Sequence, residues 1–381
     1  NQTRAKNENF SHSLKIKVTS PGRVNLIGEH TDYNGGYVLP CALNLSINLY
    51  FEINNKQSCV KTDLGYSMTF NINNPYKKSS IHWENYVFGV IEELRKIKSD
   101  LNNFSCSIKS TLPSGAGISS SSALVCGLIK GLSKLNEINL DNYEIINISR
   151  NVEHKYIGVL GGIMDQFTIM NAKRNMAILL NCEKLDSKFI KLELKEYKLL
   201  LLDTNVKHNL ANTDYNQRVS ECKEALQKIN RLCKKKYTNL SQVNRVDLSS
   251  SKEKLGKTLF KRATYVINEN QRVINSVEFL ENNKLKEFGQ LMYESHEGLK
   301  NSYEVSCKEL DFLVEYTMEY DKILGSRMMG GGFGGCTLSL IKDSFIEEFI
   351  KEIKQKYFSK FKRKLNPIIA NLNQGIQMSL N

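Results

Sequence analysis

Asp165 follows two glycines, Gly161 and Gly162, so little side-chain bulk can cover its carboxylate. A carboxylate in such a position can accept a proton from an attacking hydroxyl group. Aspartate is also a favoured N-cap of helices, and this structural role is compatible with catalysis. Glu153 lies earlier, in a segment of helical character, and is a candidate metal ligand. A solvated helical glutamate is an equally good interpretation of that residue.

A second group suited to chemistry is the loop of glycines and serines between Pro113 and Ser122. Gly115 and Gly117 allow the backbone to approach a ligand closely, and four successive serines follow from Ser119. Hydroxyl groups at the start of a helix can bond phosphate oxygens or complete the shell of a magnesium ion. A flexible turn with an N-cap is the alternative. The loop is not a Walker A motif, because no Gly-Lys-Ser/Thr follows.

Charged side chains are concentrated in a third group, a loop near the N-terminus with glycines on both sides. It contains Arg23, Glu29, His30 and Asp32. A salt-bridged surface turn is the ordinary explanation of such a loop. Carboxylates and an imidazole on a constrained loop can also hold adjacent hydroxyl groups, which is how a site selects among sugars. Together, the three groups indicate a kinase that acts on a polyhydroxylated substrate. A further glycine cluster lies at 330–335.

Hydrophobic periodicity predicts the elements that position these groups. Alternating apolar residues predict strands at 14–18 and 45–53 around the charged loop. A strand at 104–108 leads into the serine loop, and leucines spaced by four then predict a helix, an order that aims backbone N–H groups at a phosphate. Further strands are predicted at 176–182, 197–203 and 336–341, and helices at 214–232, 252–282 and 308–320. The stretch 234–254 shows no such pattern and is predicted to be a loop or a weakly ordered insertion.

The length of the chain, 381 residues, exceeds what one hydrophobic core comfortably serves, so two domains with a cleft between them are expected. We place the boundary near residue 195. The predicted parts are a flexible N-terminal tail at 1–11, an N-terminal domain at 12–195 and a C-terminal domain at 196–381. The N-terminal domain would carry the charged loop, the serine loop and Asp165.

The formal net charge of +13 suits an anionic partner such as a nucleotide. Because the basic residues are spread along the chain and the densest runs lack interleaved aromatics apart from Phe361, neither nucleic acid nor a membrane is expected as a partner. Nine scattered cysteines without zinc-site spacing favour a reducing compartment. No signal-peptide pattern or membrane-spanning apolar run is present. A soluble, cytoplasmic protein is therefore predicted.

The chain resembles the galactokinases of the GHMP small-molecule kinase superfamily, from about Lys15 to at least Ile341. Segment 21–32 matches the galactokinase signature, 83–87 is similar to the adenine-side segment, and 212–218 resembles the region of the sugar-contacting tyrosine. Further segments that fit are 261–263, 295–296, 303–307 and 325–335. The resemblance implies an α+β fold of two domains with the active site in the cleft between them.

Residue roles follow from this resemblance, position by position. It implies that Asp165 lies next to the C1 hydroxyl of the sugar, while Arg23 stabilises the transferring phosphoryl group and helps to keep Asp165 ionised. The residues implied to hold the sugar are Glu29, His30, Thr31, Asp32, Gly162 and Tyr215. The residues implied to bind ATP are Trp83 and Tyr86 near the adenine and Gly115, Ala116, Gly117, Ile118, Ser119, Ser120 and Ser121 around the phosphates. Mg²⁺ would be bound by Ser121 and Glu153.

The implied reaction is ATP-dependent phosphorylation of the C1 hydroxyl of α-D-galactose to galactose 1-phosphate and ADP, in the Leloir pathway, by a monomer or weak homo-oligomer. An N-acetylgalactosamine kinase is one alternative, because Ser122 stands where alanine is common and 119–126 resembles that branch. The quartet 29–32 and the segment 214–216 resemble the galactose-using branch instead. The other alternative is a non-catalytic galactose and ATP sensor that binds a regulatory protein. Such sensors tend to have a damaged serine loop, which here is uninterrupted.

Overall fold

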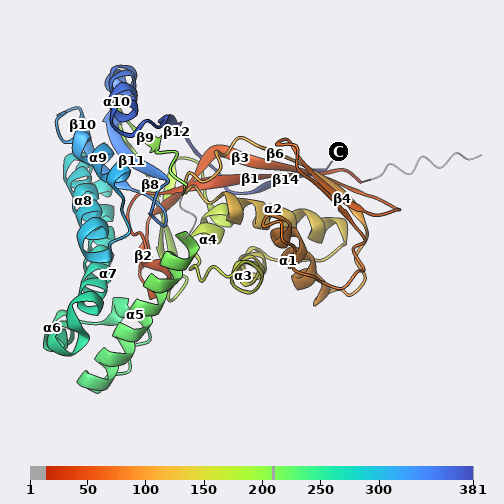
Figure 1. The fold of residues 1–381 in the computed structure, drawn as a ribbon, viewed down its shortest axis with the longest axis horizontal. Coiled ribbons are helices and arrows are strands. Elements are labelled where there is room, and N and C mark those ends of the chain that lie inside the picture. The colour runs from red at the N-terminus through yellow and green to blue at the C-terminus, as the bar shows by residue number, and fades with distance from the viewer. Residues whose placement is uncertain (1–13, 208–210, 381) are drawn as a thin grey trace, which may run out of the picture.

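The computed structural model describes residues 14–207 and 211–380, so the tail predicted at 1–11 lies outside the described residues. Three sheets and the helices around them form two lobes (Figure 1). The lobe on the right of Figure 1 contains most of the first half of the chain, and the lobe on the left contains most of the second half.

A seven-stranded sheet forms the centre of the first lobe. The alternating pattern is clear at the start of β1, where Ile16 and Val18 are buried and the residues that follow each of them, Lys17 and Thr19, are partly exposed. Helices cover the buried face (Figure 1), and α2 contacts both β1 and β3. The strands, in sheet order, are β14 (Gln377–Leu380), β1 (Ile16–Asn25), β3 (Pro40–Ile53), β6 (Phe104–Ser110), β4 (Ser58–Thr62) and β5 (Ser67–Phe70), with β13 (Leu372–Asn373) on β3. The helices are α1 (Glu84–Arg95), α2 (Ser120–Leu135), α3 (Asn142–Val152) and α4 (Met164–Asn171), with a π-helical turn, η2 (Glu153–Ile157), after α3.

The second lobe is built on a four-stranded sheet and long helices. Its sheet order is β10 (Ile323–Met328), β11 (Cys336–Lys342), β9 (Tyr197–Asp203) and β12 (Asn366–Ala370). A smaller sheet joins β2 (Tyr37–Val38), β7 (Met176–Asn181) and β8 (Ser187–Lys191). The helices are α5 (Ala211–Cys233), α6 (Arg245–Ser250), α7 (Lys252–Glu281), α8 (Leu285–Gly298), α9 (Lys308–Thr317) and α10 (Ile346–Phe361). Short turns are η1 (Asp32–Asn34), η3 (Leu240–Gln242), η4 (Leu299–Tyr303) and η5 (Asp343–Phe345).

Hydrophobic contacts join the two halves of the chain. The largest buried cluster extends from the first sheet and its helices to Val273, Phe288 and Leu338 of the second half. The strands β13 and β14, near the end of the described chain, return to the first sheet. The boundary near residue 195 stays a prediction. A division at this residue assigns β13 and β14 to the C-terminal part of the chain, although both strands pair with the first sheet.

Most of the predicted elements are confirmed, including the α+β fold class, and their ends differ by a few residues. The prediction for 234–254 was wrong, because this stretch holds η3, α6 and the start of α7. Leu240, Val243 and Leu248 are buried there in a second core cluster. Asn244 caps α6 by accepting a hydrogen bond from the backbone N–H of Asp247. The turn η3 and the helix α6 are too short for a hydrophobic period to show in the sequence.

Candidate active site

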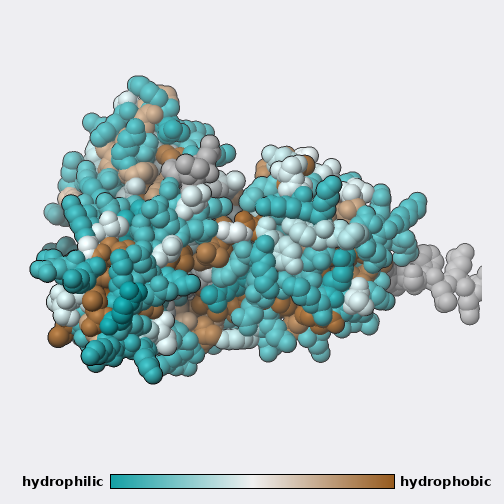
Figure 2. All heavy atoms as spheres, turned by 60° about the horizontal axis from the view of Figure 1, so that its bottom comes forward, coloured by the Kyte–Doolittle hydropathy of each residue, from teal (hydrophilic) through white to brown (hydrophobic). Residues whose placement is uncertain are grey.

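Two adjoining cavities lie among the described residues where the lobes meet. The smaller, of about 190 Å³, is polar and lined mainly by the charged loop, η2, the start of α4 and Tyr215. The larger, of about 1080 Å³, is lined by the serine loop and by apolar and aromatic side chains. Arg23 and Asp165 are the charged side chains of the described residues that line both cavities. The face in Figure 2 is mainly hydrophilic, with hydrophobic atoms visible where the two lobes meet.

Arg23 and Asp165 form an ion pair at this junction. The Arg23 Nε donates to Asp165 Oδ1 over 2.7 Å, and its Nη1 donates to the carbonyl of Gly117 over 2.7 Å. Burial lowers the pKa of Arg23, but Asp165 and then Glu29 more than offset this, so its pKa lies above the ordinary value and the cation persists. Asp165 is the second residue of α4 and Ile163 is the N-cap, so the structure does not give Asp165 the capping role.

Asp32 and Gly162 meet in the wall of the smaller cavity. The Asp32 carboxylate accepts from the backbone N–H groups of Tyr33 (3.0 Å) and Met164 (3.4 Å). A Cβ on Gly162 would lie 2.2 Å from Asp32 Oδ2, so a residue without a side chain is needed there. Burial, and next the charge of Asp165, raise the pKa of Asp32 to about 6.

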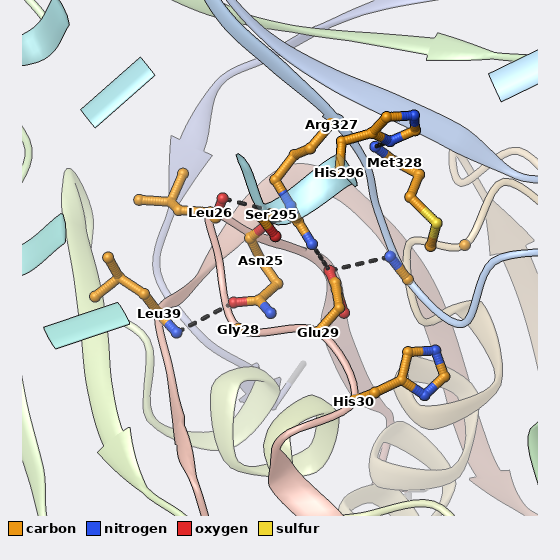
Figure 3. Close-up of polar contacts among 12 residues, drawn as sticks. Asn25, Leu26, Gly28, Glu29, His30, Leu39, Ser295, His296, Arg327 and Met328 are labelled. Atoms are coloured by element: carbon orange, nitrogen blue, oxygen red, sulfur yellow. Dashed lines mark hydrogen bonds and ion pairs between the residues drawn. The ribbon is translucent and has the colours of Figure 1, made fainter. Parts of the chain in front are cut away.

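Glu29 connects the charged loop to the second lobe. Its Oε1 pairs with Arg327 Nη2 at 3.0 Å and accepts from the backbone N–H of Gly330 at 3.0 Å (Figure 3). Arg327 is fully buried, and its Nη1 donates to the carbonyl of Asn25 over 2.8 Å. The guanidinium therefore holds both Glu29 and the end of β1. Glu29 remains part of the lining of the smaller cavity.

His30 also lines the smaller cavity, and both of its ring nitrogens have protein partners. Nδ1 lies 2.7 Å from the Tyr33 hydroxyl and Nε2 lies 3.0 Å from the carbonyl of Gly331. The His30 ring packs against Tyr215, with centroids 5.2 Å apart. Thr31, by contrast, lies outside both cavities. Its hydroxyl is 2.9 Å from the Gly28 carbonyl and braces the loop.

Glu153 is held at the back of the smaller cavity by two side-chain donors. Ser122 Oγ donates to its Oε1 over 2.6 Å, and Gln166 Nε2 donates to its Oε2 over 2.9 Å. Burial raises the pKa of Glu153 to about 7; the bond from Ser122 lowers it and the charge of Asp165 raises it further. Glu153 begins the π-helical turn η2, a kind of turn that is frequent at functional sites. Ser121 lines the same cavity.

The serine loop forms part of the larger cavity. Of the residues predicted to bind ATP, all line this cavity except Ala116, whose side chain is in the hydrophobic core. Ser119, the N-cap of α2, has a left-handed backbone with φ of 63°. The glycine cluster 330–335 lies against this loop, since a Cβ on Gly330 would approach the Gly117 carbonyl at 3.0 Å.

Several residues that complete the site had no role assigned from the sequence. Ser122 and Gln166 hold Glu153, Arg327 holds Glu29, and Gly331 accepts from His30. The signal for Ser122 was its place in the serine run. Arg327 lies just before the unassigned glycine cluster 330–335 and Gly331 lies in it, and nothing in their local sequence indicates contacts with residues about 300 positions away.

Comparison with known proteins gives a consistent family. The chain matches GHMP kinases N terminal domain at residues 85–173, galactokinase galactose-binding signature at 7–51 and GHMP kinases C terminal at 276–360. It is 40% identical to a galactokinase of Thermosipho africanus over 364 residues, which are 94% of this chain and 98% of that one. A galactokinase of Clostridium acetobutylicum is 38% identical over 374 residues, covering 96% and 95%. The crystal structure of Lactococcus lactis galactokinase complexed with galactose is similar with a TM-score of 0.88 and 31% identity over 95% of both chains.

Proposed function

Because the chain belongs to the galactokinases, a family of GHMP kinases, and is an enzyme that transfers phosphate from ATP to galactose, we propose that the transfer takes place at Asp165 and Arg23. The observation that carries this proposal is that these two side chains, paired at 2.7 Å, line both cavities. Galactose would occupy the smaller, polar cavity and ATP the larger one. The reacting groups then meet at the junction.

Asp165 is proposed to act on the C1 hydroxyl of galactose. Arg23 bonds Oδ1 of the carboxylate, which leaves Oδ2 for the sugar. The hydroxyl oxygen attacks the γ-phosphorus, its proton passes to the Asp165 carboxylate, and the bond from the γ-phosphorus to the β–γ bridging oxygen breaks as ADP leaves. Arg23 stabilises the charge that spreads over the transferring group. Since phosphoryl transfer depends mainly on positioning, holding both substrates at one ion pair supplies much of the catalysis.

The other polar groups of the smaller cavity are proposed to hold the remaining sugar hydroxyls. The carboxylate of Asp32 can accept from sugar hydroxyls next to the backbone of Gly162. Arg327 binds Oε1 of Glu29, so Oε2 of Glu29 can accept from a sugar hydroxyl. His30 and Tyr215 form the aromatic part of the wall. Thr31 is proposed to bind no substrate directly and to keep the loop in shape.

The serine loop is proposed to bind the phosphates, with Trp83 and Tyr86 near the base. Among the described residues that line the two cavities, two buried side-chain atoms have no hydrogen-bond partner: Ser119 Oγ at the larger cavity and Gln166 Oε1 at the smaller one. A phosphate oxygen can accept a hydrogen bond from the Ser119 hydroxyl, and a sugar hydroxyl can donate one to Gln166 Oε1. The stacking surface for the adenine is supported by Trp83 and Tyr66, whose ring centroids are 6.5 Å apart in the larger cavity.

The residues at the junction fit a magnesium ion. Within the described residues no three acidic, histidine or cysteine side chains form a metal-binding group. Magnesium at kinase sites is held by one or two carboxylates and by the substrate phosphates, so a full protein cage is not needed. The pKa of both Asp32 and Glu153 is raised by burial and by nearby carboxylates, which indicates a deficit of positive charge. Ser121 and Glu153 are proposed to hold the ion, which would neutralise phosphate charge when bound.

Several features bear on the cellular setting. None of the helices in 14–207 and 211–380 is both long and apolar enough to cross a membrane. All nine cysteines lie in these ranges, and none is in a disulfide. We propose the reducing cytoplasm as the setting of the protein, and a monomer or weak homo-oligomer stays a prediction.

A phosphorylation assay with ATP and a panel of galactose, N-acetylgalactosamine, glucose, mevalonate and homoserine tests the proposed function. Galactose should have the highest kcat/KM, because Glu29, His30, Asp32 and Tyr215 line the smaller cavity and leave little room for an acetamido group. An equal or higher kcat/KM for N-acetylgalactosamine would contradict this assignment. Binding of galactose and ATP without turnover would instead indicate a sensor.

A further inference from the structure

His30 in the sugar cavity is joined to the second lobe by a chain of short polar contacts. Its Nδ1 lies 2.7 Å from the Tyr33 hydroxyl, which lies 2.7 Å from the Tyr303 hydroxyl, which lies 3.0 Å from Cys222 Sγ. His30 and Tyr33 belong to the charged loop and η1, Tyr303 ends η4, and Cys222 is in α5. The contacts thus cross from one lobe to two elements of the other.

Asn34 connects the two ends of this hydrogen-bond chain, His30 and Cys222. Its Nδ2 donates to the His30 carbonyl over 2.9 Å and to Cys222 Sγ over 3.6 Å. Tyr303 is fully buried, and His30, Asn34 and Cys222 are each less than 5% exposed. Tyr33 is partly buried. Water is therefore largely excluded from the other four members, and these polar groups depend on their neighbours in the hydrogen-bond chain for partners.

The hydrogen bond between His30 and Gly331 determines which group donates in every other bond of this hydrogen-bond chain. The Gly331 carbonyl can only accept, so the proton of a neutral imidazole must be on Nε2, which donates over 3.0 Å. Nδ1 then has a lone pair and accepts from the Tyr33 hydroxyl. Tyr33, having donated its one proton, accepts from Tyr303, and Tyr303 in turn accepts from the Cys222 thiol.

The protonation states of the members support this order. Burial lowers the pKa of His30 to about 3; the bond to Gly331 raises it, and the cations of Arg218 and Arg327 lower it further. Burial raises the pKa of Tyr33 and Tyr303 well above the ordinary value of a phenol. Burial also raises the pKa of the Cys222 thiol to about 11. At neutral pH all four groups are therefore uncharged, and each has one proton to donate.

We propose that Tyr33, Tyr303 and Cys222 are positioning residues that hold His30 as the neutral Nε2–H tautomer and so fix its ring in the wall of the galactose cavity. This rests on the proposed function, since it assigns the smaller cavity to the sugar. The fixed ring bonds Gly331 of the second lobe and packs on Tyr215. The hydrogen-bond chain from His30 to Cys222 thereby links the relative position of the lobes to the shape of the sugar site.

Nitrogen-15 NMR of the intact protein with labelled histidines tests the tautomer without any substrate. The His30 signals, assigned by their loss in His30→Gln, should show a protonated Nε2 and an unprotonated Nδ1 at pH 7. A protonated Nδ1 or an imidazolium at His30 would overturn the proposal. Because the measurement needs no turnover, its outcome is independent of whether galactose is the substrate.

Kinetics of matched variants test the positioning role. Tyr33→Phe should raise the KM for galactose by roughly tenfold, the usual weight of one buried hydrogen bond. Tyr303→Phe should raise it by less, because Tyr33 still donates to His30, and both variants should change the KM for ATP by less than about twofold. Tyr357→Phe is the control, because it removes a buried hydroxyl that donates to the Thr204 carbonyl outside both cavities. Equal KM values for galactose in Tyr33→Phe and Tyr357→Phe would overturn the proposal.

The thiol end of the chain offers a conservative pair of variants. Cys222→Ser keeps a donor for Tyr303 and should retain the wild-type His30 spectrum and galactose KM. Cys222→Ala removes the donor and should raise the galactose KM, by less than Tyr33→Phe does because Tyr33 still donates to His30. A Cys222→Ser variant that behaves like Cys222→Ala would show that the thiol acts only by its bulk and would remove Cys222 from the chain.

Discussion

Replacement of Asp165 by Asn tests the chemistry with a minimal change of shape. In the structure Asp165 Oδ1 accepts from Arg23 Nε over 2.7 Å. An asparagine can keep this acceptor oxygen towards Arg23, while its amide nitrogen replaces Oδ2. The asparagine side chain then donates a hydrogen bond at the position where the carboxylate accepted one. It can therefore neither take the proton of a sugar hydroxyl nor orient that hydroxyl by accepting a hydrogen bond from it. The expected loss in kcat is about a hundred- to ten-thousand-fold.

The same substitution should have little effect on stability, because two electrostatic changes oppose each other. Arg23 loses its nearest anion but keeps Glu29 and Asp32, which also raise its pKa. Asp32 and Glu153 lose a negative neighbour that raises the pKa of both. Breaking a fully buried pair costs about 3–5 kcal/mol. With this relief, and with the Asp165 side chain 28% exposed, we expect a change in the free energy of unfolding below about 2 kcal/mol.

The assay compares Asp165→Asn with Asp203→Asn at saturating galactose and ATP. Asp203 is a buried aspartate outside both cavities, so its variant controls for the loss of a buried carboxylate. Turnover, the dissociation constant of galactose and the denaturation midpoint are measured for both. If folded Asp165→Asn kept more than about a third of wild-type turnover, far above the loss expected for a general base, the residue would be structural and our mechanism wrong.

Three further predictions concern groups around this pair. Arg327→Met leaves Glu29 buried without its cation, so stability should fall by about 3–5 kcal/mol and galactose KM should rise. Lys188→Met, which breaks an exposed pair, should cost less than about 1 kcal/mol in the same denaturant titration, and equal losses would contradict the assigned role of Arg327. Ser121→Ala should weaken use of magnesium and ATP far more than galactose binding measured by calorimetry, and unchanged turnover across a magnesium titration would exclude Ser121 as a ligand. The pKa of Asp32 is raised to about 6, so the folded protein holds a proton that the unfolded chain releases between about pH 4 and 6. Its contribution to stability is therefore present at pH 4 and lost by pH 7. A shift of about two pKa units corresponds to about 2–3 kcal/mol, and this loss should be absent from the pH profile of the Asp32→Asn variant.

The sequence predicted the features that depend on residues close together along the chain. The alternation of Ile16, Val18 and their polar neighbours is sufficient to predict β1, because one face of the strand is buried. The glycines and serines of 115–122 indicate a loop with an open backbone and hydroxyl groups before a helix. Arg23 and Asp165 were predicted as partners only through family resemblance, and the structure pairs them at 2.7 Å.

The unpredicted parts depend on contacts between distant segments. Arg327 is an ordinary strand residue in sequence, and its role arises only when β10 lies beside the end of β1. The chain from His30 to Cys222 likewise requires α5 and η4 to meet the charged loop. The pairing of β13 and β14 with the first sheet depends on tertiary packing, because the sequence pattern of neither short strand indicates which strand it pairs with.

A crystal structure with galactose and a non-hydrolysable ATP analogue tests the central claim most directly. We predict galactose in the smaller cavity, with its C1 hydroxyl at about 2.6–3.2 Å from the Asp165 carboxylate, and the triphosphate along Gly115–Ser121 with its terminal group beside Arg23. Galactose bound elsewhere, or another of its hydroxyl groups against Asp165, would contradict the account.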